Sequence, residues 1–290
     1  MPELPEVEHV TRGIRPFVQG QKIEDVIFSD KVIEGKNSQK ETIIKGLSLD
    51  TFKNFTEGYT INNIERRSKY IVFYIQNNST QRILISHLGM AGGFFVVDHI
   101  EDISAPNYRK HWHVIFKLDN DKLLVYSDIR RFGEIRNVAS FEGYPSFLEI
   151  APEPFEKEAL PHYMSWFDKK LYLNKPIKQM ILDHRVISGC GNIYACEALF
   201  RAGIHPARIS KDLNHQEKEM LFYYVREVLE AGIKYGGTSI SDYRHADGST
   251  GTMQQYLNVY KQKTCKVCGN DIETQIIATR NSHFCPVCQK

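Results

Sequence analysis

The feature that most constrains the fold is a pair of Cys-x-x-Cys motifs near the end of this 290-residue chain. Cys265 and Cys268 form the first pair, and Cys285 and Cys288 form the second. Each short turn directs two sulfurs toward one point, so the spacing predicts a tetrahedral zinc site. Four thiolates leave no open coordination position, so one structural zinc ion is expected. The alternative is a pair of disulfides, which is typical of small secreted domains and less suited to a chain this long.

Composition indicates an ordinary globular protein, with 42% hydrophobic and 25% charged residues. The length suggests about two domains and a small third module. No run approaches the ~18 apolar residues of a membrane span. Acids and prolines occupy the first six residues, where a secretory signal has basic and apolar blocks. We therefore expect a cytoplasmic protein.

The charges are unevenly distributed although the net charge is only +2. Residues 141–158 carry five glutamates and one lysine, while the bases gather elsewhere. Basic clusters occur at residues 66–69, 109–111, 130–136, 169–178 and 261–266. Such clusters suit a nucleic-acid groove if the fold brings them together, or they are separate solvated faces. Charge alone leaves both interpretations open.

The hydrophobic periodicity changes along the chain. A helix is predicted from Pro5, and residues 22–138 show many short strands, which indicate a sandwich or a barrel. The acidic stretch 141–161 is the best linker candidate. Helical spacing follows, including a helix over 216–234 capped by Asn214. Residues 236–252 form a long polar loop of a kind that often serves as a lid.

Pro2 is the most unusual residue for chemistry. Removal of Met1 would leave a secondary amine at the N-terminus, and α-amino groups titrate near ~8 rather than the ~10.4 of lysine. A secondary amine that attacks an aldehyde-level carbon yields an iminium, a strong electron sink for elimination. Glu3 is adjacent as a possible proton donor or acceptor. The alternative is that this proline merely precedes a helix.

Several motifs together resemble the formamidopyrimidine-DNA glycosylase family of bacterial DNA repair enzymes, and the resemblance runs from residue 2 to 290. The motifs are Met1–Glu8, Arg67–Tyr70, His87–Met90, Asp128–Gly133, Gly189–Glu197, Ala202–Pro206 and the two cysteine pairs. Singly, His-Leu-Gly-Met or Gly-x-Gly-Asn would be weak signals. In this order they are highly specific.

The resemblance implies an α+β multidomain fold. Its parts would be an N-terminal β-sandwich flanked by helices, a helix–two-turns–helix domain and a C-terminal zinc finger. The predicted boundaries are 1–140 for the catalytic domain, 141–161 for the linker, 162–235 for the helical domain, 236–260 for a lesion-capping loop and 261–290 for the finger. The protein would bind double-stranded DNA containing oxidised bases or abasic sites, as a monomer, and would be associated with the bacterial nucleoid.

The resemblance also implies a catalytic mechanism. Pro2 would attack C1′ of a flipped damaged nucleotide, release the base and hold the sugar as a Schiff base, after which β- and δ-elimination cut the strand. Glu3 is similar to the acid that assists opening of the sugar ring. Lys69 is similar to the residue that serves β-elimination, and Arg280 to the finger arginine that serves δ-elimination. Without the resemblance, an exposed lysine at a strand start is the simpler interpretation of Lys69.

Further residues match positions that contact DNA in the family. Met90, Arg130 and Phe132 would fill the void left by the extruded base. Asn192 follows Gly-x-Gly at a predicted helix start, where free N–H groups suit a phosphate, although it could be only a helix cap. The remaining predicted DNA contacts are His111, Lys175, Lys178 and Tyr260. The predicted lesion pocket comprises Glu6, Glu197 and Ser239.

Two other functions are compatible with part of these observations. The related endonuclease VIII branch acts on oxidised pyrimidines. A non-catalytic nucleic-acid-binding protein could use the same groove and finger, but it would have no need for Pro2 and Glu3. Met90 together with Arg130 and Phe132 favours the purine branch.

Overall fold

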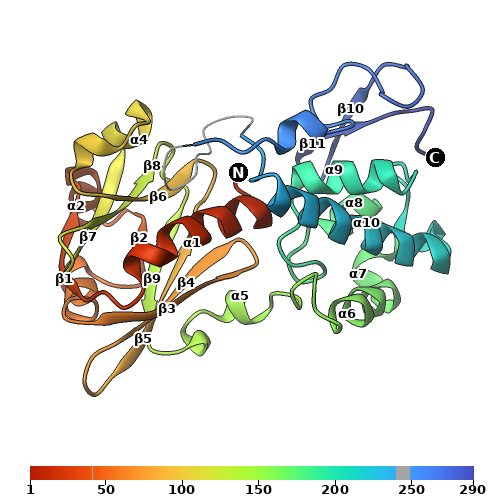
Figure 1. The fold of residues 1–290 in the computed structure, drawn as a ribbon. Helices are drawn as coiled ribbons and strands as arrows, with labels where there is room; N and C mark the ends of the chain where they lie inside the picture. The colour runs from red at the N-terminus through yellow and green to blue at the C-terminus, as the bar shows by residue number, and fades with distance from the viewer. Residues whose placement is uncertain (41, 240–248) are drawn as a thin grey trace. The chain divides into compact units, whose positions relative to one another are not determined.

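The computed structural model describes residues 1–40, 42–239 and 249–290, and its fold is of the mixed α+β class (Figure 1). The chain separates into two compact units. The first comprises Met1–Leu148 with Gly236–Gly251, and the second comprises Glu149–Tyr235 with Thr252–Lys290. The boundary at Leu148 falls within the acidic stretch 141–161.

Two facing sheets form the first unit, as predicted for a sandwich. The four-stranded sheet has the order β1-β7-β8-β6, and the five-stranded sheet has the order β2-β9-β5-β4-β3. Pairing is antiparallel except between β2 and β9. The strands are β1 Ile23–Phe28, β2 Ile44–Lys45, β3 Thr60–Arg67, β4 Tyr70–Gln76, β5 Gln81–His87, β6 Gly92–Val97, β7 Trp112–Leu118, β8 Leu123–Asp128 and β9 Glu134–Val138.

Helix α1 (Leu4–Val18) confirms the helix predicted from Pro5. Proline suits the first turn because its missing N–H would be unpaired there anyway. Val7, Val10 and Ile14 repeat at helical spacing and are fully buried. The helix therefore anchors the N-terminus of the chain in the core of the sandwich.

The many short strands predicted within residues 22–138 are present, but the described residues of this β-region also contain three α-helices that were not predicted. Helices α2 (Asp30–Asn37), α3 (Leu49–Asn54) and α4 (Pro106–Lys110) interrupt it. Local capping explains α3, because the Ser48 hydroxyl accepts the Thr51 N–H at 3.1 Å. Serine and aspartate at the start of α2 and α3 are helix-start signals that outweigh the strand-like composition around them.

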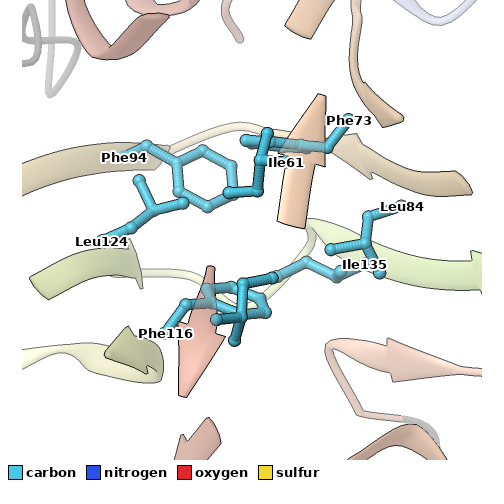
Figure 2. A pocket seen from close by; sticks show the side chains of 8 residues that line it. Ile61, Phe73, Leu84, Phe94, Phe116, Leu124 and Ile135 are labelled. Carbon is cyan, nitrogen blue, oxygen red and sulfur yellow. The ribbon is translucent and has the colours of Figure 1, made fainter. Parts of the chain in front are cut away.

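The core of the sandwich is closely packed. Phe94, Phe116 and Leu124 from one sheet meet Phe73 and Leu84 from the other (Figure 2). Between them lies a cavity of about 10 Å³ whose lining side chains are all apolar. A water molecule would find no hydrogen-bond partner there, so the cavity is a packing defect and not a binding site.

The second unit is helical and ends in a β-hairpin. Its longest helix, α10 (His215–Lys234), confirms the helix predicted over 216–234. Asn214 caps it as predicted: its side chain accepts the Glu217 N–H at 2.9 Å, and its own N–H donates to the Glu217 carboxylate at 2.8 Å. The other elements of this unit are α6 Ala159–Ser165, α7 Lys170–Leu173, α8 Ile177–Ile181, α9 Asn192–Arg201, β10 Glu273–Ile277 and β11 Arg280–Phe284.

Short elements complete the fold. They are α5 Pro145–Leu148 and the 3₁₀ helices η1 Ile100–Asp102, η2 Phe141–Gly143, η3 Trp166–Asp168, η4 Ser210–Asp212 and η5 Met253–Tyr256. Within the described ranges, no helix combines the length and the apolar run needed to span a bilayer.

Truncation of Leu84 tests the packing of the sandwich. Leu84 is 3% exposed and lines the central cavity, so Leu84→Ala enlarges a space that the sheets cannot close. We expect the free energy of unfolding, measured in urea, to fall by about 2–5 kcal/mol. The control is Leu148→Ala at a side chain that is 55% exposed, where the change should stay within about 0.5 kcal/mol. Equal effects of the two variants would contradict the assigned core.

Candidate functional site

The N-terminal residues predicted to be catalytic lie at the first turn of α1. Pro2 and Glu3 are both buried. Glu3 occupies the N-cap position and forms a capping box with Glu6. In it, the Glu3 N–H donates to the Glu6 carboxylate at 2.8 Å. The backbone around Pro2 is thus held in place by the helix that follows it.

The second oxygen of Glu6 reaches a distant segment. It accepts the Thr238 N–H at 2.7 Å and the Thr238 hydroxyl at 3.0 Å. Gly237 has φ +75°, and a Cβ there would lie 2.8 Å from the same carboxylate oxygen. Glycine is therefore required for this close approach. Glu6 links the first turn of α1 to the start of the loop predicted to cap the lesion.

The stem of that loop is closed by a separate contact. The Gly251 N–H donates to the Ser239 hydroxyl at 3.0 Å. A Cβ on Gly251 would lie 2.1 Å from the Gly236 carbonyl oxygen, so the two ends of the loop are in backbone contact. Ser239, predicted for the lesion pocket, is thus a stem residue. Residues 240–248, which belong to the predicted lesion-capping loop, lie outside the described residues.

The two segments predicted to fill the DNA void are packed against each other. Met90 is half-buried in the β5–β6 connection, while Phe132 in the β8–β9 connection is 61% exposed. Gly89 has φ +61°, and a Cβ there would lie 2.4 Å from the backbone nitrogen of Gly133. Backbone contact at these glycines holds Met90 and Phe132 on adjoining loops.

A buried carboxylate shapes the β8–β9 connection. Asp128 is fully buried and accepts the Arg130 N–H at 3.0 Å and the Gly133 N–H at 2.8 Å. Arg130 is exposed, and its guanidinium lies 4.9 Å from the centroid of the Phe132 ring. Asp128 lies in the motif Asp128–Gly133, but no role was predicted for it. An aspartate followed closely by a glycine in a short connection was the available signal.

Three cationic side chains predicted to act on DNA belong to residues adjacent to turn residues with positive φ. Ser68 (φ 57°) precedes Lys69, Arg131 (φ 56°) follows Arg130, and Thr279 (φ 63°) precedes Arg280. Non-glycine residues in this region cost of order 1–3 kcal/mol and persist where the surroundings fix them, commonly at functional sites. Arg280 is exposed at the first position of β11, directly after the turn of the finger hairpin. Lys69 is half-buried in the β3–β4 turn.

Asn192 is the first residue of α9, and the helix cap is Gly191. The alternative that Asn192 is only a cap is therefore excluded. Its side-chain amide donates to the Asn281 carbonyl at 2.9 Å, which connects α9 to the strand that begins with Arg280. Asn192, a candidate phosphate ligand, is thus bound to the strand that begins with Arg280, the candidate catalytic arginine.

Glu197 does not line an open pocket, which corrects its predicted place in the lesion site. It is 1% exposed. One carboxylate oxygen accepts the Asn258 N–H at 2.7 Å and the Asn258 side-chain amide at 3.0 Å. The other accepts the N–H groups of Val259 at 3.0 Å and Tyr260 at 2.9 Å. Glu197 instead fixes the segment that carries the candidate DNA ligand Tyr260, which is itself half-buried.

The other predicted DNA contacts differ in accessibility. Lys175 is exposed and His111 is half-buried. Lys178 is fully buried, and its ammonium donates to Cys196 and Ser282. A phosphate cannot reach an ammonium enclosed in this way, so the structure corrects the prediction of a direct DNA contact for Lys178.

The four finger cysteines form one cluster. Their sulfurs all lie within 4.8 Å of one another, with 3.8 Å between Cys265 and Cys288 and 3.4 Å between Cys268 and Cys285. Four thiolates around a zinc ion at about 2.3 Å lie roughly 3.8 Å apart, so the donor set fits tetrahedral zinc. Cys190 and Cys196 are also buried, but they do not belong to this group of four.

Family models match three consecutive parts of the chain. Residues 1–135 match the N-terminal domain of formamidopyrimidine-DNA glycosylase, and residues 150–244 match its H2TH domain. Residues 262–290 match the zinc finger found in FPG and IleRS. With the cysteine geometry, this match identifies the C-terminal module as a zinc finger with one structural zinc ion.

Curated relatives match over the full length. Formamidopyrimidine-DNA glycosylase of Histophilus somni is 36% identical over 292 residues and covers 100% of both chains. The Bacillus anthracis protein of the same name is 36% identical, covering 100% of this chain and 99% of its own.

Solved structures of proteins with this name also match nearly the whole chain. MutM (FPG) of Thermus thermophilus has a TM-score of 0.82 at 32% identity, with coverage of 99% and 98%. The Lactococcus lactis Fpg in complex with DNA containing an abasic site has a TM-score of 0.81 at 33% identity, with 100% coverage of both chains.

Replacement of one finger cysteine tests the metal site. We expect Cys268→Ser to lower the zinc content from about one ion per chain to near zero, because three thiolates hold structural zinc far more weakly than four. Metal analysis of the dialysed protein measures this directly. Cys190→Ser replaces a buried cysteine outside the cluster and should retain the metal. Full zinc content in the Cys268 variant would contradict the assignment.

Proposed function

The chain belongs to the formamidopyrimidine-DNA glycosylase family, and from this we propose that it excises oxidised purines, such as 8-oxoguanine and formamidopyrimidines, from duplex DNA in base excision repair. It then acts as a lyase at the abasic site. The observation that carries the proposal is the buried Pro2–Glu3 pair, held by Glu6 at the start of α1 in a chain that matches its relatives from end to end.

Pro2 acts as the nucleophile once Met1 is removed. Its secondary amine attacks C1′ of the damaged nucleotide, a C–N bond forms, and the bond from C1′ to the base breaks as the base leaves. After the amine has lost its proton, cleavage of the C1′–O4′ bond opens the sugar ring and leaves an iminium at C1′, which withdraws electrons from the sugar. Loss of the C2′ proton and then of the C4′ proton allows the 3′ and 5′ phosphates to leave in turn. Because an α-amino group titrates near ~8, a useful fraction is free base at neutral pH.

Glu3 supplies a proton to the sugar ring oxygen as the ring opens. The capping box fixes its backbone, and burial separates it from bulk water, which favours directed proton transfer. Glu6 has a supporting role, since its two oxygens are used by Glu3 and Thr238. In this proposal Glu6 couples the reactive end of the chain to the lesion-capping loop.

Met90, Arg130 and Phe132 fill the space that the extruded base leaves in the duplex. An apolar wedge and a planar guanidinium can both replace a base in the stack. The exposure of Arg130 and Phe132, and the backbone contact between their loop and that of Met90, support this role.

The remaining cations and amides bind the DNA backbone. We assign Lys69 to β-elimination and Arg280 to δ-elimination, with Asn192, Tyr260, Lys175 and His111 as further phosphate contacts. We retain the five sequence segments defined above as the domains of the protein. Because the proposed substrate is chromosomal DNA, the proposed place of action is the bacterial cytoplasm, in association with the nucleoid.

Borohydride trapping tests the nucleophile. With duplex DNA containing 8-oxoguanine, reduction during turnover should yield a covalent complex whose protein attachment maps to Pro2. Pro2→Gly should reduce trapping at least about tenfold, because the secondary amine is lost. Arg12→Ala, at an exposed position of α1, is a control that should still trap. Undiminished trapping in the Pro2 variant, with the adduct on a lysine, would refute the mechanism.

Opposite-base preference tests Arg130. Its two parallel N–H donors match the O2 and N3 acceptors of cytosine, whereas adenine offers one acceptor beside a donor. This mismatch costs about 1–3 kcal/mol, so excision of 8-oxoguanine opposite cytosine should exceed excision opposite adenine by about one to two decades. Arg130→Ala should reduce the ratio of the two rates, and the neighbouring Arg131→Ala should preserve it. Equal rates in the unmodified protein, or better activity on thymine glycol, would favour the endonuclease VIII branch.

A further inference from the structure

Lys178 on α8 is a buried cation that the proposed chemistry does not use. Its side chain is 0% exposed. The ammonium donates to the Cys196 sulfur on α9 at 3.2 Å and to the Ser282 hydroxyl on β11 at 2.6 Å. Burial raises the pKa of the Cys196 thiol, so the sulfur is a neutral acceptor. An ammonium is costly to bury unless its donors are satisfied, so these contacts define where it can lie.

The contact continues from Ser282 to Arg280. An ammonium has donors only, so the Ser282 oxygen accepts from Lys178 and its hydroxyl hydrogen remains available for another bond. That hydroxyl donates to the Arg280 carbonyl, at an oxygen–oxygen distance of 3.5 Å. Residues two apart on a strand share a face, so fixing Ser282 also fixes the side from which Arg280 projects.

Two further bonds hold the same strand to α9. The Asn192 amide donates to the Asn281 carbonyl at 2.9 Å, and the His283 N–H donates to the Cys196 sulfur at 3.4 Å. Three consecutive residues of β11 are therefore each bound by a side chain from α8 or α9. Lys178 is the member of this set whose bond leads directly to Arg280.

We propose that Lys178 is a positioning residue: through Ser282 it sets the backbone at Arg280, and Cys196 keeps its ammonium in place. This inference rests on the proposed function, because it takes Arg280 as the group that serves δ-elimination. Lys178 itself touches neither DNA nor the reacting atoms. Its loss should therefore mimic a misplaced Arg280 and leave the zinc site intact.

Lys178→Met and Ser282→Ala test whether the bond between Lys178 and Ser282 positions Arg280. With duplex DNA containing an abasic site, each variant should shift the products from β,δ-cleavage toward β-cleavage by roughly 10- to 100-fold, the size of effect expected from a misplacement of about 1 Å. Single-turnover release of 8-oxoguanine should change much less. Zinc content should equal that of the unmodified protein. Cys196→Ala should show a smaller shift, and its matched control, Cys190→Ala at another buried cysteine, should show none.

Double variants separate positioning from direct contact. If Lys178 acts through Ser282 and Arg280, adding Lys178→Met to Ser282→Ala or to Arg280→Ala should cause no further loss. If Lys178 bound a phosphate itself, the effects would multiply, and the proposal would be overturned. A Ser282→Ala protein with an unchanged product ratio would also overturn it, and this small substitution keeps the test valid if Lys178→Met fails to fold.

Hydrogen exchange supplies a readout that does not depend on activity. In the DNA-free protein, amides of residues 281–284 should exchange faster in Lys178→Met and Ser282→Ala, and unchanged protection in both would refute the positioning role. Failure of the proposed function has a different signature, because the unmodified protein would then release no base and cut no strand. The two outcomes are thus distinguishable.

Discussion

The structure depends on one repeated interaction, a buried carboxylate that accepts backbone N–H groups from a loop. Glu6 binds Glu3 and Thr238, Asp128 binds Arg130 and Gly133, and Glu197 binds Asn258, Val259 and Tyr260. Isolated carboxylates are expensive to bury, whereas charge-assisted bonds to several amides offset that cost. Each carboxylate therefore has one stable arrangement, which fixes the residues that donate to it.

Each of these loops carries residues proposed to act on DNA. A loop that was free in solution would lose conformational entropy on binding, and that loss would weaken the complex. Here the carboxylates hold their donor residues in place before DNA binds. Strained turn residues such as Ser68 and Thr279 fit the same pattern, because their backbone conformations are held by the strands that flank them. In these segments the carboxylates hold the proposed binding groups through backbone N–H groups.

Local signals explain what the sequence could predict. The cap at Asn214, the apolar stripe of α1 and the spacing of the finger cysteines depend on residues close together in the chain. Glu197 and Lys178 were misjudged because their partners are distant: Tyr260 is 63 residues from Glu197, and Ser282 is 104 residues from Lys178. A charged residue in a helical pattern looks the same whether it faces solvent or a buried donor. Only tertiary structure distinguishes the two.

The bond between Glu6 and Thr238 has a consequence for protein synthesis. It joins residues 232 positions apart, and the first unit is complete only when Gly236–Gly251 has been added to Met1–Leu148. At about 5–20 residues per second, a ribosome needs roughly 5–20 s to proceed from residue 148 to residue 251. During that interval the sandwich strands exist while Glu6 lacks its second partner. A translation product that stops within this interval therefore carries the proposed nucleophile without the bond between Glu6 and Thr238, which can form only after residue 238 has been added.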